Sequence, residues 1–103
     1  MISVTPAAAE QIRVSARQGN MQGMPLRIAV TRLQDGSFHY ALGFDDTSRE
    51  GDNMFKSEGI DIVVAPQSLP MLDGTVIDYV DIEGKHEIIF INPNDPAQQQ
   101  PDS

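Results

Sequence analysis

The chain has 103 residues and a mass of 11.3 kDa, 40% of its residues are hydrophobic, and it contains no cysteine. This length is sufficient for one domain with its own hydrophobic core. Without cysteine, the protein cannot form disulfides, use a thiolate nucleophile, or hold zinc or an iron–sulfur cluster through cysteine ligands.

Charged side chains are distributed unevenly along the chain. Seven basic and fifteen acidic residues give a net charge of −8, which disfavours binding to nucleic acid or to an anionic membrane surface. Residues 1–32 carry four arginines against one glutamate, whereas residues 33–103 carry three basic against fourteen acidic side chains, a net charge of −11. No apolar run approaches the ~20 residues of a membrane-spanning helix, and no secretory signal pattern is present, so we expect a cytoplasmic protein.

The N-terminal half predicts a short strand, a helix and a β-hairpin. Thr5 provides an oxygen to cap a helix, Pro6 suits its first position, and Gly19 follows its last residue. Apolar residues recur at helical spacing between these signals and alternate with other residues in the next two segments. We predict a strand at residues 2–4, a helix at 6–18, and strands at 26–31 and 37–44 that pair antiparallel around a turn at 34–36.

The C-terminal half predicts further short strands separated by turns. Pro70 limits any helix between residues 66 and 72 to about one turn. The run from His86 to Ile91 is apolar on both faces, which is typical of an interior strand. The final residues are rich in proline, glutamine and aspartate and predict disorder. We expect a strand that begins at Met54, strands at residues 60–65, 75–81 and 86–91, and a disordered polar tail at residues 95–103.

About seven short strands, one N-terminal helix and a short second helix indicate a mainly β (α+β) domain over residues 1–94. The frequent turns favour two packed sheets, as in a compact β-sandwich, or a small barrel, over βαβ units. The helix is expected to cover one face or one end of the sheets.

Few residues suggest catalysis or metal binding. The sequence lacks a nucleophile elbow, a phosphate-binding loop, a dinucleotide fingerprint and a zinc-protease motif. His39 and His86 lie in predicted strands, and three aspartates, Asp45, Asp46 and Asp52, lie in a polar loop without the pattern of a calcium site. A packed or solvated role is the simpler interpretation of all five, although imidazole and carboxylate ligands would suit iron or zinc.

Several short motifs follow one another in a characteristic order. They are LRIAV at residues 26–30, YALGF at 40–44, GIDIVV at 59–64, LDGT at 72–75, IDYV at 77–80 and FINPN at 90–94. Their order and separation resemble the A-type iron–sulfur carriers, the HesB/IscA-like proteins. The resemblance covers residues 2–94 and implies the fold of that family.

The resemblance also shows where the chemistry of the carriers is missing. Carriers of this family have one cysteine in a turn after the Leu-Arg strand and two in a Cys-Gly-Cys tail, which align without gaps with Asp35, Gln99 and Pro101. A carboxylate, a neutral amide and a proline ring cannot replace three thiolates. Asp35 with Gly36 is also an ordinary hairpin turn pair, and we expect that role rather than iron binding.

Cysteine-free members of the family are accessory proteins, among them proteins associated with dissimilatory sulfur oxidation. The resemblance therefore implies a non-enzymatic accessory or regulatory protein that has no cofactor and acts by binding a macromolecule. The alternative is a carrier of mononuclear iron or another divalent metal that uses Asp35, His39, His86 or carboxylates.

A protein is the expected partner, with nucleic acid as a lesser alternative because of the net charge. Without a shared cluster to join subunits, we expect a monomer. An acidic partner would dock on the basic segment, because arginine is enriched at interface anchors. The residues predicted for this surface are Arg13, Arg17, Arg27 and Arg32.

Overall fold

The structure is a computed structural model that describes residues 1–47 and 49–98. Its elements are β1 (Ser3–Val4), α1 (Pro6–Gln18), β2 (Leu26–Arg32), β3 (Phe38–Phe44), β4 (Asn53–Ser57), β5 (Ile60–Val64), α2 (Leu69–Leu72), β6 (Val76–Ile82), β7 (Lys85–Ile91) and η1 (Pro96–Gln98). All the predicted strands form, and their boundaries agree with the prediction to within one residue. Among the described helices, none has the length and hydrophobicity of a membrane span.

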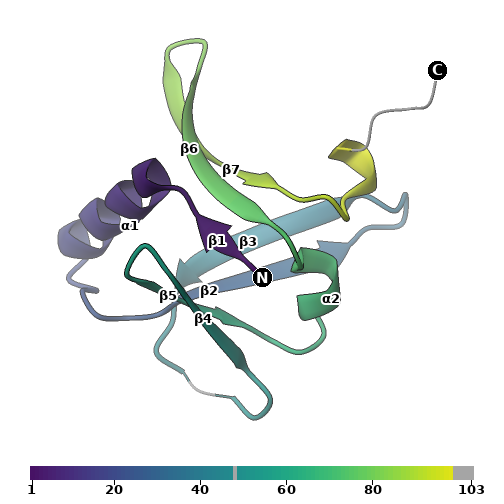
Figure 1. The fold of residues 1–103 in the computed structure, drawn as a ribbon, viewed down its shortest axis with the longest axis horizontal. Helices are drawn as coiled ribbons and strands as arrows, with labels where there is room; N and C mark the ends of the chain where they lie inside the picture. Colours follow the sequence, from purple (N-terminus) through teal and green to yellow (C-terminus); the bar gives the residue numbers. More distant parts are fainter. Residues whose placement is uncertain (48, 99–103) are drawn as a thin grey trace.

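The strands form two sheets, which confirms the mainly β prediction (Figure 1). In the first sheet, with the order β1-β6-β7, β6 runs parallel to β1 and antiparallel to β7. In the second, with the order β3-β2-β5-β4, β2 pairs antiparallel with β3, as predicted, and parallel with β5. The described strands do not close into a barrel, so the two-sheet alternative is correct and the barrel is wrong.

One hydrophobic core joins both sheets and α1. On β2, Leu26, Ile28 and Val30 are buried at every second position, as the strand period requires. Full burial of such a side chain contributes roughly 1.5–3 kcal/mol, so this core is the main source of stability. Its buried members are Ile2, Val4, Ala8, Ala9, Ile12, Leu26, Ile28, Val30, Phe38, Ile60, Ile62, Val64, Leu72 and Ile77.

Helix α1 begins and ends where the sequence predicts. Thr5 Oγ1 accepts a hydrogen bond from Ala8 N at 3.2 Å and donates one to Asp78 Oδ1 at 2.7 Å, so one hydroxyl both caps the helix and joins it to β6. The inward face of α1 has one large side chain, Ile12, among small ones. The small side chains allow the helix to pack closely against β6. Because they are small, they leave space unfilled along the sides of the helix. The buried residues of α1 are Ala8, Ala9, Ile12 and Ala16.

Strand β7 lies at a sheet edge, which corrects its predicted interior position. Among the described strands it pairs with β6 alone, and Ile91 is 48% exposed. Ile88 and Phe90 pack against the core from one face. The apolar pattern was misleading because it reports on the faces of a strand and carries no information about how many strands lie beside it.

The chain remains ordered beyond the predicted domain boundary at residue 94. Asp95 is only 3% exposed, and the next three residues form η1. Residues 95–98, which the sequence placed in a disordered tail, thus have hydrogen-bonded polar side chains in the structure. The rest of the predicted tail, residues 99–103, lies outside the described residues.

Candidate functional site

The turn between β2 and β3 contains Asp35, one of the three positions predicted from the sequence to match the cysteines of the family carriers. Its carboxylate accepts hydrogen bonds from Ser37 Oγ at 2.6 Å and from Ser37 N at 2.9 Å, and these bonds lower the pKa of Asp35. Gly36 has a φ of 88°, a conformation that glycine adopts without strain. Leu33 N closes the turn by donating to Ser37 O at 2.8 Å. Asp35 thus has the turn role that its sequence context indicates.

Four polar side chains, which we call the C-terminal clasp, fasten the end of the described chain: Tyr40, Asn92, Asp95 and Gln98. Tyr40 OH donates to Asp95 Oδ2 at 2.7 Å and accepts from Asn92 Nδ2 at 3.1 Å. Gln98 Nε2 donates to Phe90 O at 2.8 Å, and Gln98 Oε1 accepts from Asn92 N at 2.9 Å. Burial and the hydrogen bond to Asp95 raise the pKa of Tyr40 to about 12, so its phenol stays protonated and continues to donate.

The clasp brings the C-terminal segment to the same side of the molecule as the turn that holds Asp35. Tyr40 lies near the start of β3, directly after this turn. In Figure 1, the short helix η1, drawn in yellow, lies beside the start of β3. Gln99 and Pro101, the other two positions predicted to match family cysteines, lie outside the described residues. The described backbone therefore holds η1 on the same side of the molecule as the turn that contains Asp35.

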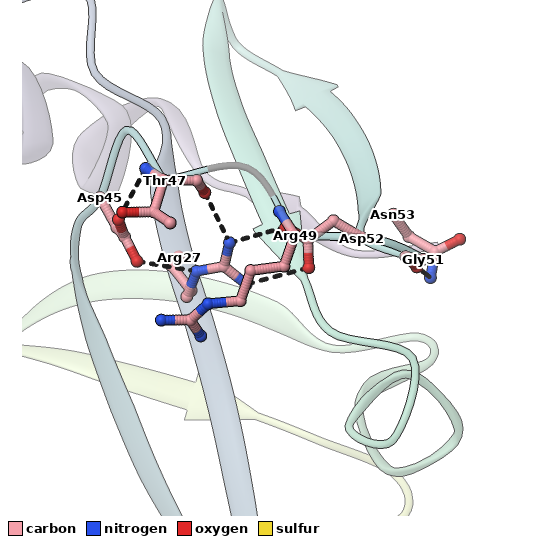
Figure 2. Close-up of polar contacts among 7 residues, drawn as sticks. All are labelled: Arg27, Asp45, Thr47, Arg49, Gly51, Asp52 and Asn53. Atoms are coloured by element: carbon pink, nitrogen blue, oxygen red, sulfur yellow. Dashed lines mark hydrogen bonds and ion pairs between the residues drawn. The ribbon is translucent and has the colours of Figure 1, made fainter.

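Arg27 forms ion pairs with Asp45 and Asp52 and a hydrogen bond with the backbone carbonyl of Thr47, and we call these four residues the Arg27 cluster (Figure 2). Its Nη2 and Nη1 donate to the two carboxylate oxygens of Asp52 at 2.7 and 3.1 Å, and its Nε donates to Asp45 Oδ2 at 3.0 Å. Nη2 also donates to Thr47 O at 3.0 Å. The Arg27 side chain is only 12% exposed. These contacts make Arg27 an internal structural residue, which differs from its predicted place on a docking surface.

The same cluster accounts for two of the three aspartates in the acidic loop. The hydrogen bonds from Arg27, together with one from Arg49 N, lower the pKa of Asp52 to about 2. Hydrogen bonds from Thr47 lower the pKa of Asp45, and Arg27 adds to this effect. The two carboxylates therefore neutralise a guanidinium within the protein, and Asp46 is the exposed member of the three.

The other three predicted arginines lie in two places. Arg13 and Arg17 are neighbours on α1, where Glu10 accepts from Arg13 at 3.4 Å and pairs with Arg17 at 3.7 Å. Arg13 Nη1 also donates to Glu58 O at 2.9 Å. Arg32, at the end of β2, lies over the ring of Phe38, with its guanidinium carbon 5.4 Å from the centroid. Only Arg13 and Arg17 thus form one surface.

The two histidines lie on different strands and have different surroundings. His39 is exposed on β3, whereas His86, on β7, stacks on Tyr79 with 5.5 Å between the ring centroids. Within residues 1–47 and 49–98, no three histidine, aspartate or glutamate side chains converge as they would around a metal ion. The described part of the chain therefore provides no ligand set for the mononuclear-metal alternative.

Two open cavities flank α1, and reasoning from the sequence did not identify them. One has a volume of about 350 Å³ and is lined in part by Arg13 and Arg17. The other has a volume of about 530 Å³ and is lined in part by Tyr79 and His86. In the sequence, the only sign of the smaller cavity is the pair Arg13 and Arg17 next to the small side chain of Ala16. The cavities could not be predicted because they depend on how the helix lies over strands that are distant in sequence.

Comparison with known proteins agrees with the fold and the motif order. The family model for iron-sulphur cluster biosynthesis matches residues 1–98. A protein of Aquifex aeolicus (strain VF5) is 40% identical over 80 residues, which cover 78% of this chain and 69% of that protein. The iron-sulfur cluster insertion protein ErpA of Photorhabdus laumondii is 33% identical over 94 residues, which cover 90% of this chain and 81% of ErpA.

A crystal structure of IscA with a [2Fe-2S] cluster superposes with a TM-score of 0.77, at 28% sequence identity, covering 91% of this chain and 86% of IscA. The fold, the match of the family model to residues 1–98 and the identity to ErpA all lead to the same assignment. This chain belongs to the iron–sulfur cluster biosynthesis family, the HesB/IscA-like proteins, and is a member without cysteine.

Proposed function

We propose that this protein is a non-enzymatic accessory or regulatory protein of iron–sulfur or sulfur metabolism, which binds a protein partner and carries no cluster of its own. The observation that supports this proposal best is the combination of an IscA-like fold with the absence of cysteine from all 103 residues. Among pathways, we propose sulfur oxidation because the chain resembles cysteine-free family members associated with that process, and we propose the cytoplasm as its location.

The residues at the site support the loss of cluster binding. A cluster of this kind is held by soft thiolate ligands, whereas the carboxylate of Asp35 is a hard ligand already bonded to Ser37. The sequence places an amide at Gln99 and a ring without a donor at Pro101. None of these groups supplies the electron-rich sulfur that iron in a cluster requires.

A retained surface supports partner binding. The protein has a hydrophobic core and a C-terminal segment held by hydrogen bonds to β3. It has this structure although it lacks the cysteines with which carriers of the family bind a cluster. Arg13 and Arg17 are about half exposed in a protein that is otherwise strongly acidic. Because no cluster links subunits, we propose that the protein is a monomer when free, which sedimentation equilibrium would measure.

The test is affinity purification of the tagged full chain from the cells that make it, followed by reassembly of any complex from purified components. We expect one protein to be recovered in stoichiometric amount and to bind again in vitro. An untagged strain processed in parallel is the control. Recovery of no protein above the control level would contradict the proposed function.

A further inference from the structure

The two cavities beside α1 are parts of one groove. Ile12 and Phe44 line both of them, so these two side chains form a ridge between a cavity of about 350 Å³ and one of about 530 Å³. The smaller cavity extends towards the start of β5 at Ile60, and the larger towards Ile88 on β7. We call this feature the α1 groove.

The floor of the α1 groove is mainly apolar on both sides of the ridge. The smaller cavity is lined in part by Ala16, Met24 and Ile60, and the larger by Leu26, Leu42 and Ile88. Binding sites in proteins are typically lined by apolar side chains of this kind. Leu42 is 38% exposed although it faces in the same direction as the core residue Phe38 on β3. Apolar surface is therefore left uncovered here.

Charge is placed at one end of the groove. Arg13 and Arg17 line the smaller cavity, with side chains that are 43% and 55% exposed. They share a single carboxylate, Glu10, and the acid that lines the same cavity, Asp61, is paired with Lys56 at 3.6 Å. Two guanidiniums with one shared counter-ion retain free donors for further carboxylates.

We propose that the α1 groove is the docking site for a short segment of the partner protein that carries two apolar side chains and a flanking carboxylate. The inference rests on the proposed function and names the class of partner. Two cavities on either side of one ridge match two anchoring side chains better than one small molecule. The carboxylate of the segment pairs with Arg13 and Arg17, in keeping with an interface that has an apolar centre and a polar rim.

A phage-displayed library of random dodecapeptides, selected against the immobilised full chain, tests this proposal even while the partner is unidentified. We expect enriched sequences to carry two apolar residues close together and aspartate or glutamate beside them. A synthetic consensus peptide should bind the Arg13→Gln/Arg17→Gln variant at least about tenfold more weakly than the wild type, as expected when charged anchors are removed.

The matched control is Arg32→Gln/Arg49→Gln, which removes the same charge from arginines that do not line the groove. It should bind the peptide as the wild type does. Ala16→Leu, which fills the smaller cavity from its wall, should also weaken binding, with circular dichroism to verify folding. Enrichment of basic peptides, no enrichment, or equal binding by the two double variants would overturn the proposal.

Two further outcomes would assign the groove differently. Self-association of the wild type that disappears in Arg13→Gln/Arg17→Gln would assign the groove to a second copy of the chain and overturn the proposal. A stoichiometric partner that binds Arg13→Gln/Arg17→Gln as well as it binds the wild type would be consistent with the proposed function. It would nevertheless overturn the proposal that the partner docks in the α1 groove.

Discussion

The Arg27 cluster and the rim of the α1 groove both consist of arginines from the basic N-terminal segment, but the arginines have different surroundings. Arg27 is 12% exposed and has two carboxylates and a carbonyl around it. Arg13 and Arg17 are about half exposed and share Glu10. One basic segment can therefore contain both an arginine that stabilises the fold and arginines that are available for binding. The exposure of each arginine and the number of its carboxylate partners distinguish the two roles.

Replacing Arg27 should have the largest effect on stability. Arg27→Met keeps part of the apolar stem but leaves Asp45 and Asp52 without their guanidinium, so we expect a loss of about 2 kcal/mol in the free energy of unfolding. Urea denaturation followed by circular dichroism measures it. Arg32→Met is the control, and an equal loss in both variants would remove the distinction between buried and exposed arginines.

The pH dependence of stability should identify Asp52 as the main partner of Arg27. The pKa of Asp52 is lowered to about 2 in the folded protein from an ordinary value of 3.8. A lowered folded-state pKa stabilises the protein fully above the unfolded-state pKa, and this contribution is lost as the pH falls towards the folded-state value.

Asp52→Asn has no such contribution at any pH. The difference in unfolding free energy between wild type and Asp52→Asn should therefore be largest at neutral pH and shrink steadily below about pH 4. Denaturation at a series of pH values measures the difference. A difference that is constant down to about pH 2 would show that Asp52 acts without its charge.

The C-terminal clasp differs from the Arg27 cluster because its central side chain, Tyr40, is neutral. Tyr40→Phe keeps the ring stacked on Phe90 at 4.6 Å but removes the hydroxyl between Asn92 and Asp95. We expect a loss of about 1 kcal/mol, smaller than for Arg27, because one neutral donor is lost. Amide hydrogen exchange should accelerate at residues 95–98 in particular. Unchanged exchange there would mean that the clasp does not hold η1.

The groove arginines should show the smallest effect on stability. Arg13→Gln/Arg17→Gln loses only exposed pairs with Glu10 and the contact to Glu58 O, so the change is expected to stay within about 0.5 kcal/mol. Thermal denaturation measures it. A loss as large as that of Arg27→Met would mean that these arginines are structural and would end the contrast between the two regions.

The sequence predicted the strands, the helix and the hairpin because local signals determine them. Thr5 and Pro6 mark the start of α1, and alternation marks β2 and β3. It could not separate Arg27 from the other arginines, because Asp45 and Asp52 approach Arg27 only after β2 pairs with β3 and β5. Position relative to distant strands is tertiary information.

Similar reasons explain the other differences. In the sequence, Asp95 belongs to a polar segment that predicts disorder. Its hydrogen bond with Tyr40 could not be predicted because the two residues meet only in the folded protein. The apolar faces of β7 indicated contacts but not the number of neighbouring strands. The α1 groove arises where small side chains of the helix meet strand ends distant in sequence, and no single segment contains that information.

Anaerobic reconstitution with ferrous iron and sulfide tests the central claim most directly, namely a carrier fold without the ability to carry a cluster. The wild type should remain colourless, whereas Asp35→Cys/Gln99→Cys/Pro101→Cys, which places thiolates at the three positions predicted to match the family cysteines, should gain cluster absorption with bound iron and sulfide. A stable stoichiometric cluster on the wild type would contradict the account.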